Sequence, residues 1–135
     1  MPDIILASKS KVRLHILNKN NVVCSAKPSN VDEDEIKVAM LRDGASPQDI
    51  SKNLAEIKAN KVSQNNLDKI VIGADSVIDL ENEIISKPKN RSEALEILKK
   101  LNGKTHYLIS SVCISKNGSM LWHYTDKAEL KMKTM

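Results

Sequence analysis

Residues 69–76, with the sequence KIVIGADS, constrain the fold more than any other part of the chain. Positions 70–72 are a β-branched apolar run, and the Gly-Ala pair at 73–74 ends this run before a carboxylate, Asp75. Short runs of this kind, bounded by small residues, are typical of strands covered on both faces. Because open α/β sheets bind ligands beyond the carboxyl ends of such strands, we expect Asp75 to lie where ligands bind. A turn-capping role is the alternative, and this stretch alone favours it.

The composition indicates one globular domain over residues 1–135, with a core large enough to need no disulfides or metals. The hydrophobic content of 41% and the charged content of 28% are ordinary for such a domain. A net charge of +4 suits an anionic small molecule as well as a nucleic acid. With one Trp, two Tyr and no Phe, few side chains can stack on bases, so we expect no nucleic-acid partner.

The two cysteines and the N-terminus bear on where the protein is located. Cys24 and Cys113 lie far apart, each in an apolar run, without the spacing of a zinc site or the density of a disulfide scaffold. We expect both to be buried, inert thiols. The first apolar run is only four residues long and follows an acid, unlike a signal peptide or a membrane span. We therefore expect a cytoplasmic protein with no membrane partner.

Apolar runs and helix-capping residues predict strands and helices throughout the chain. The first half is predicted to contain a strand over 3–7, a helix from the cap Ser10 to about Asn20, a strand over 22–26, a helix from the acids at 32–35 to Asp43, and a long helix from Ser46-Pro47 to about Asn65. The second half is predicted to contain a hairpin over 76–80 and 83–86, a helix capped by Asn90 or Ser92, a strand over 105–115, a turn at Asn117-Gly118, a strand over 119–125, and a half-exposed strand from Ala128 to Met132. We expect Leu95, Leu98 and Leu101 on the core side of the fourth helix.

Two charged segments follow the first two predicted strands. Lys9, Lys11 and Arg13 lie at the start of the first helix, where backbone amides and basic side chains form natural phosphate sites. A solvated basic loop is the alternative. The acids at 32–35 stabilise the start of the second helix, and carboxylates of this kind also suit a divalent metal.

Seven short motifs occur in order along nearly the whole chain. They are L-A-S-x-S with an arginine (Leu6 to Arg13), V-D-E (Val31 to Glu33), L-A-x-x-K-A (Leu54 to Ala59), V-I-G-A-D (Val71 to Asp75), K-P (Lys87-Pro88), E-A-x-x-x-L (Glu93 to Leu98) and L-x-G-x-x-H (Leu101 to His106). In this order they resemble the Maf-like family of nucleoside triphosphate pyrophosphatases.

The resemblance implies an α/β fold, with a mixed twisted sheet flanked by helices and a central cleft between two lobes. It also implies hydrolysis of a nucleoside triphosphate to the monophosphate and pyrophosphate with a divalent metal, Mg or Mn. Asp75 matches the family's proton acceptor, and with Glu33 it is a candidate metal ligand. The positions that match the family's phosphate-binding residues are Ser8, Arg13, Lys58 and Lys87.

The chain departs from the family pattern at two positions that bear on base specificity. The family's opening continues S-P-R-R, or S-P-W-R in the branch that prefers 7-methyl-GTP, whereas Lys11 and Val12 stand here. Ser76 replaces the threonine that follows the aspartate in the branch acting on dTTP and UTP. The resemblance therefore leaves the preferred base open.

A third departure is length, because similar proteins continue with further helices and strands. We therefore expect residues 1–135 to be a single Maf-like domain that is C-terminally incomplete. A non-catalytic remnant that binds nucleotides or a partner without turnover is the alternative function. The alternating residues 128–132 give the last strand an apolar face and an unpaired edge, which would allow a homodimer.

Overall fold

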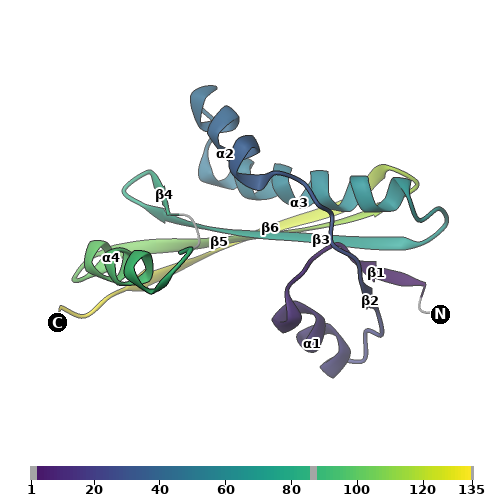
Figure 1. Cartoon of the computed structure of the whole chain (residues 1–135), viewed down its shortest axis with the longest axis horizontal. Coiled ribbons are helices and arrows are strands. Elements are labelled where there is room, and N and C mark those ends of the chain that lie inside the picture. The colour runs from purple at the N-terminus through teal and green to yellow at the C-terminus, as the bar shows by residue number, and fades with distance from the viewer. Residues whose placement is uncertain (1–2, 86–87, 135) are drawn as a thin grey trace.

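The computed structural model describes residues 3–85 and 88–134, which form a six-stranded sheet between two layers of helices (Figure 1). In chain order the elements are β1 (Ile4–Leu6), α1 (Lys11–Lys19), β2 (Ser25–Ala26), α2 (Glu33–Arg42), α3 (Pro47–Gln64), β3 (Ile70–Leu80), β4 (Glu83–Ile85), α4 (Arg91–Leu101), β5 (Thr105–Lys116) and β6 (Ser119–Lys131). Helices α2 and α3 lie on one face of the sheet, and α1 and α4 lie on the other (Figure 1).

The sheet is mixed because its strands are connected in two ways. β1 pairs in parallel with β2 and β3, whereas β3 pairs antiparallel with β4 and β5, and β5 pairs antiparallel with β6. Parallel neighbours need a crossover connection, which α1 supplies between β1 and β2. The resulting strand order is β2-β1-β3-β5-β6, with β4 beside β3. The predicted mixed sheet flanked by helices is therefore confirmed.

β3 is longer than predicted, and the expectation that the strand stops at Gly73 was wrong. It runs unbroken for 11 residues, and its alternate residues, Asp75 among them, are buried on the face toward α3. Gly73 does not end the strand because it serves a packing role: a Cβ there would collide with the Ala55 carbonyl oxygen and with Ala59 of α3. The glycine lets the helix approach the sheet closely. Asp75 consequently lies in the middle of β3 instead of beyond its end.

Substituting Gly73 with alanine tests this close approach. We expect Gly73→Ala to lower the free energy of unfolding by about 3 kcal/mol, because the clash involves helix backbone that cannot rotate away. Gly44→Ala is the control: its Cβ would meet nothing within 4 Å, and only its positive φ of 81° opposes the change. We expect the control to cost about 1 kcal/mol. Urea unfolding measures both variants. Equal losses of unfolding free energy in Gly73→Ala and Gly44→Ala would show that α3 and β3 are not closely packed at Gly73.

The fourth helix begins where predicted, with Asn90 as its N-cap, but it packs differently from the prediction. Leu95 and Leu98 were expected in the core, yet they are 53% and 56% exposed, and only Leu101 of the three is buried. The reason is that α4 contacts β3 and β4 through Ile97 and Leu101, close to its C-terminal end. Its other apolar side chains therefore remain at the surface.

The last strand is one element instead of the two predicted. β6 runs continuously for 13 residues after a turn at Asn117 and Gly118, both of which have positive φ. It pairs with β5 along this length, with a register irregularity between Ile114 and Ser115. β6 ends the described strand order, so the predicted edge position is confirmed. β2 is shorter than predicted and comprises only residues 25–26.

Both cysteines are buried and free, as predicted. Burial raises the pKa of both thiols, and in Cys113, with a smaller contribution from the charge of Glu56, it raises the pKa to about 11. Within the described residues, no helix has the length and apolar character needed to cross a membrane.

The raised thiol pKa predicts slow alkylation of the folded protein. At pH 8, a thiol with a pKa of about 11 is ionised in only about one molecule in a thousand, and the thiolate is the reactive form. We expect iodoacetamide to label Cys113 slowly in buffer and fully in urea, as followed by mass spectrometry. Rapid labelling of Cys113 in the folded state would contradict the inert role.

Candidate active site

The candidate site lies at the carboxyl end of β1, where the chain leaves the sheet. β1 pairs with β3 as far as Ile72, and the Ala7 amide still donates to the Ile72 carbonyl at 2.8 Å. The following loop, residues 7–10, leads directly into α1, whereas β3 continues past it. Arg13 of α1 donates from its guanidinium to the Ala74 carbonyl of β3 at 3.2 Å. Ligands in open α/β sheets bind beyond the carboxyl end of a strand, and here that strand is β1. Asp75 comes from the neighbouring strand, β3.

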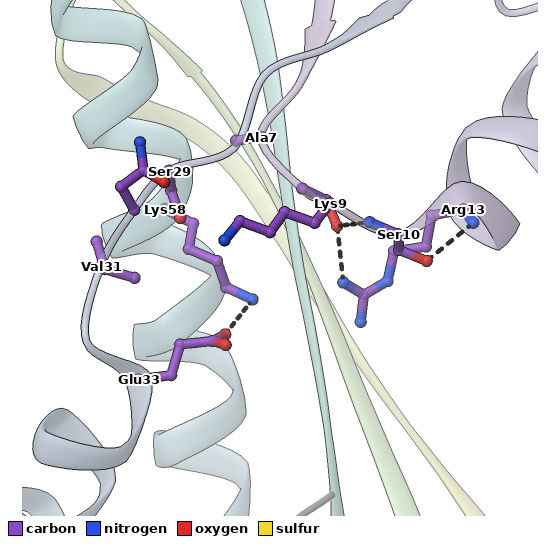
Figure 2. Close-up of a pocket in the computed structure, with 10 residues that line it drawn as sticks. Ala7, Lys9, Ser10, Arg13, Ser29, Val31, Glu33 and Lys58 are labelled. Carbon is purple, nitrogen blue, oxygen red and sulfur yellow. Dashed lines mark hydrogen bonds and ion pairs between the residues drawn. The ribbon is translucent and has the colours of Figure 1, made fainter. Parts of the chain in front are cut away.

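Hydrogen bonds within the β1–α1 loop gather polar and basic groups at the start of α1. The Ser8 hydroxyl accepts from the Ser10 amide at 3.0 Å and from the Arg13 guanidinium at 3.4 Å. Ser10 caps the helix as predicted, since its hydroxyl accepts from the Arg13 amide at 3.2 Å (Figure 2). The positive end of the helix dipole adds to the charge of Arg13. This arrangement suits an anion such as a phosphate.

Lys58 of α3 joins two carboxylates that are distant in the sequence. Its Nζ lies 3.1 Å from Asp75 Oδ1 and 2.6 Å from Glu33 Oε1 (Figure 2 shows the Glu33 contact). Lys58 is 6% exposed and Asp75 is 5% exposed, so this charge pair is shielded from water. A buried charge requires a charged or hydrogen-bonding partner. The structure thus explains why a lysine on this helix lies inside the fold.

Burial and charged neighbours shift the pKa of the Asp75 carboxyl in opposite directions. Burial raises its pKa above the usual value, the charge and hydrogen bond of Lys58 and the charge of Lys37 lower the pKa, and the Glu33 carboxylate raises it. Its second oxygen, Oδ2, is buried and has no hydrogen-bond partner among the described residues. A buried carboxyl with a perturbed pKa and an open acceptor is typical of functional sites.

A cavity of about 360 Å³ opens between the β1–α1 loop and the start of α2. Ser8, Lys9, Arg13, Glu33 and Lys58 line it, and Figure 2 shows the Lys9 side chain reaching into the space between Lys58 and Arg13. The cavity therefore carries basic groups on both sides and one carboxylate. Such a lining suits a polyanion accompanied by a cation.

A second cavity, of about 350 Å³, is mostly apolar and shares only Arg13 with the first. It is lined by Asp75, Ser76 and Tyr124, among others. Ile72, Ala74 and Ser76 line it and alternate along β3 with the residues buried toward α3, so this cavity adjoins the opposite face of the sheet. Ser76 also shares a hydrogen bond of 2.9 Å with the Ser110 hydroxyl. Asp75 therefore lines the apolar cavity and is linked to the first cavity through its contact with Lys58.

The structure brings most of the predicted site residues together. The residues that gather around the two cavities are Ser8, Arg13, Glu33, Lys58, Asp75 and Ser76. Val12 is 68% exposed and lines neither cavity. Lys87, the remaining predicted phosphate ligand, lies outside the described residues. Among residues 3–85 and 88–134, no group of three or more His, Cys, Asp or Glu side chains is placed to hold a metal.

Sequence reasoning missed Ser51 of α3, a polar residue that contacts the backbone of Asp75. It is fully buried, and its hydroxyl donates to the Asp75 carbonyl at 3.1 Å. The available signal was its spacing of seven residues before Lys58, which puts both side chains on one face of a helix.

The chain is similar to a known protein family and to several known proteins. The family model described as "Maf-like protein" matches residues 3–135. A nucleoside triphosphate pyrophosphatase of Pelagibacter ubique is 65% identical over 98% of this chain and 68% of its own length. A protein of the same name from a Ruegeria species is 42% identical (96% and 65% covered), and a 7-methyl-GTP pyrophosphatase of Brucella abortus is 35% identical (98% and 66% covered).

The chain thus spans about two thirds of the length of these relatives (68%, 65% and 66%). Among solved structures, a HAM1 protein from Coxiella burnetii superposes with a TM-score of 0.54 at 18% identity, covering 96% of this chain and 73% of that one. This similarity shows the fold alone.

Proposed function

The chain belongs to the Maf-like protein family, and from that premise we propose that it hydrolyses nucleoside triphosphates to the monophosphate and pyrophosphate. The observation that carries this proposal is the buried Asp75 carboxylate, which contacts Lys58 in the wall of a cavity lined with basic side chains and has a second oxygen without a hydrogen-bond partner among the described residues. The names of the relatives agree with this chemistry.

The phosphates of the substrate would bind in the cavity of about 360 Å³. Ser8 and Arg13 already share a hydrogen bond, so both groups can contact one phosphate. Lys58 approaches from the other side of the cavity, and the Lys9 side chain reaches from the β1–α1 loop into the space between Lys58 and Arg13 (Figure 2). Phosphoryl transfer depends mainly on positioning and on stabilising the charge that develops on phosphate oxygens. These four side chains supply both.

The two carboxylates on Lys58 fit a divalent cation. Asp75 has a buried oxygen without a hydrogen-bond partner in the described part of the chain, and the Glu33 carboxylate lies against the same lysine. Mg²⁺ is usually held by one or two carboxylates together with substrate phosphates and water, so a third protein ligand is not required. We propose that Glu33 and Asp75 hold Mg²⁺ or Mn²⁺, which would polarise a phosphoryl oxygen and acidify a bound water.

Asp75 is the proposed proton acceptor for the attacking water. A base is most effective when its pKa lies near the working pH, and burial moves the pKa of Asp75 in that direction. The charge and hydrogen bond of Lys58 lower this pKa and thus oppose the effect of burial, and the hydrogen bond also orients the carboxyl. A buried proton acceptor needs both a raised pKa and a fixed orientation.

We propose that the nucleobase of the substrate binds near Ser76, in the wall of the apolar cavity next to Asp75, and that this contact determines which nucleobase is preferred. Val12 would contact the base only if the base extended over the exposed start of α1. The relatives are named for nucleoside triphosphates in general and for 7-methyl-GTP, so a substrate panel has to decide.

We further propose a cytoplasmic location and a homodimer formed through the β6 edge. β6 ends the described strand order and exposes Trp122 and Tyr124, and unpaired strand edges favour association. Sedimentation equilibrium at several protein concentrations measures the dimer, and a constant monomer mass would exclude it. Cell fractionation tests the location.

Turnover of a nucleotide panel tests the proposed activity. The protein is incubated with the common nucleoside triphosphates and 7-methyl-GTP, in Mg²⁺ or Mn²⁺, and the products are separated by chromatography. We expect the monophosphate and pyrophosphate in equal amounts. Release of orthophosphate with the nucleoside diphosphate would mean that the bond between the β and γ phosphates is cleaved, which would contradict the proposal. Nucleotide binding without any product would favour a non-catalytic nucleotide-binding role.

A further inference from the structure

Ser51 makes a buried hydrogen bond to the backbone of the candidate proton acceptor. The residue is 0% exposed, and its hydroxyl donates to the Asp75 carbonyl at 3.1 Å and lies 3.4 Å from the Ile109 carbonyl, which shares the same donor. Ile109 is on β5, the strand that pairs with β3 around Asp75. One hydroxyl on α3 therefore contacts both strands next to the site.

The same helix contacts Asp75 a second time, through Lys58. Ser51 and Lys58 are seven residues apart, which is about two helical turns, so both side chains point toward the sheet. Ser51 bonds the Asp75 backbone, and Lys58 bonds its carboxylate at 3.1 Å. The close approach at Gly73 lets a side chain as short as serine reach the strand.

Holding a carbonyl and a carboxylate from one rigid element fixes the direction in which the side chain points. The Ser51 bond restrains the peptide that follows Asp75, and with it the backbone from which the Asp75 side chain projects. Sub-ångström placement of a catalytic group has large effects on rate. We infer that Ser51 is a positioning residue that keeps the Asp75 carboxylate aligned with Lys58 for catalysis. This inference rests on the proposed function.

Ser63 provides a matched control on the same helix. It is also 0% exposed, and its hydroxyl accepts from the Gly118 amide at 2.9 Å and donates to the Asn60 carbonyl at 2.9 Å. It fixes the C-terminal end of α3 to the turn between β5 and β6, and it lines neither cavity of the site. Ser63→Ala therefore removes a comparable buried hydroxyl without touching Asp75.

Steady-state kinetics on Ser51→Ala and Ser63→Ala separate positioning from general packing. We expect Ser51→Ala to lower kcat by about 10- to 100-fold with little change in KM, since the phosphate-binding groups stay in place. Ser63→Ala should lose a similar amount of thermal stability and keep kcat. Normal kcat in Ser51→Ala, or an equal loss of kcat in both variants, would overturn the inference.

A second measurement is independent of turnover. The ¹³C chemical shift of the Asp75 carboxyl carbon reports its contact with Lys58 in the protein without nucleotide. We expect this shift to move in Ser51→Ala and to stay in Ser63→Ala. An unmoved shift in Ser51→Ala would overturn the inference. If the wild-type protein turned over no nucleotide, the proposed function would fail, and the carboxyl shift would still decide the role of Ser51.

Discussion

Replacing Asp75 with asparagine is expected to lower turnover by about 10²- to 10⁴-fold, the range associated with losing a general base. Asparagine keeps the shape of the side chain and can still accept the hydrogen bond from Lys58, but it cannot accept a proton from water. It also removes the negative charge from the buried Oδ2 position proposed for the metal. The variant should fold normally, so the loss should appear in kcat and not in circular dichroism.

Asp79→Asn is the control for this experiment. Asp79 lies on the same strand and the same buried face, four residues further on, and is 7% exposed. Its carboxylate accepts from the Asn82 amide at 2.9 Å in the β3–β4 turn, away from both site cavities. We expect Asp79→Asn to keep turnover. Near-normal turnover in Asp75→Asn would show that Asp75 is only structural.

Replacing Lys58 with methionine is expected to lower the free energy of unfolding by about 3–5 kcal/mol near pH 7, because a buried carboxylate loses its cation. Lys58 is 6% exposed and lies 3.1 Å from the Asp75 carboxylate. Methionine has a similar length, so packing is nearly kept. Urea unfolding measures the change. Lys61→Met, on the exposed side of the same helix, should cost far less.

The loss in Lys58→Met should depend on pH in a defined direction. Burial already raises the pKa of Asp75, and removing the Lys58 charge that opposes burial raises it further. A carboxyl whose pKa is higher in the folded state binds its proton more tightly there, so its stabilisation is complete below the unfolded pKa and is lost as pH rises through the folded pKa. The variant should therefore recover stability relative to the wild type as the pH falls from about 7 to about 4.

The double variant Lys58→Met/Asp75→Asn completes the test. With neither charge of the pair present, we expect most of the lost stability to return and its pH dependence to disappear. A double variant as unstable as Lys58→Met would mean that the loss comes from packing or from the Glu33 contact instead.

Much of the fold could be predicted because the relevant signals are local. Helix caps act within one turn: the structure confirms Ser10 and Ser46, and it has Asn90 as the cap of the fourth helix, one of the two residues predicted there. The errors concern long-range packing. The role of Gly73 depends on the carbonyl of Ala55, and nothing near Gly73 in the sequence indicates that a helix packs against it.

The sequence predicted most residues of the candidate site but not the contacts among them. The order of motifs assigned roles to Arg13, Glu33, Lys58 and Asp75, and the structure brings these four residues together. The sequence could not show that Lys58 joins both carboxylates, because α2, α3 and β3 meet only in the folded chain. Ser51 was missed for the same reason, since its partner is a backbone carbonyl.

The central claim is that this cavity holds the triphosphate and its metal, and a crystal structure with Mn²⁺ and an α,β-methylene nucleoside triphosphate tests it most directly. The methylene group replaces the oxygen that bridges the α and β phosphates, so this bond cannot be hydrolysed. The anomalous signal of manganese locates the ion. We expect the phosphates against Ser8 and Arg13, with manganese between them and the carboxylates of Glu33 and Asp75. A triphosphate bound away from this cavity, or manganese that contacts neither carboxylate, would contradict the account.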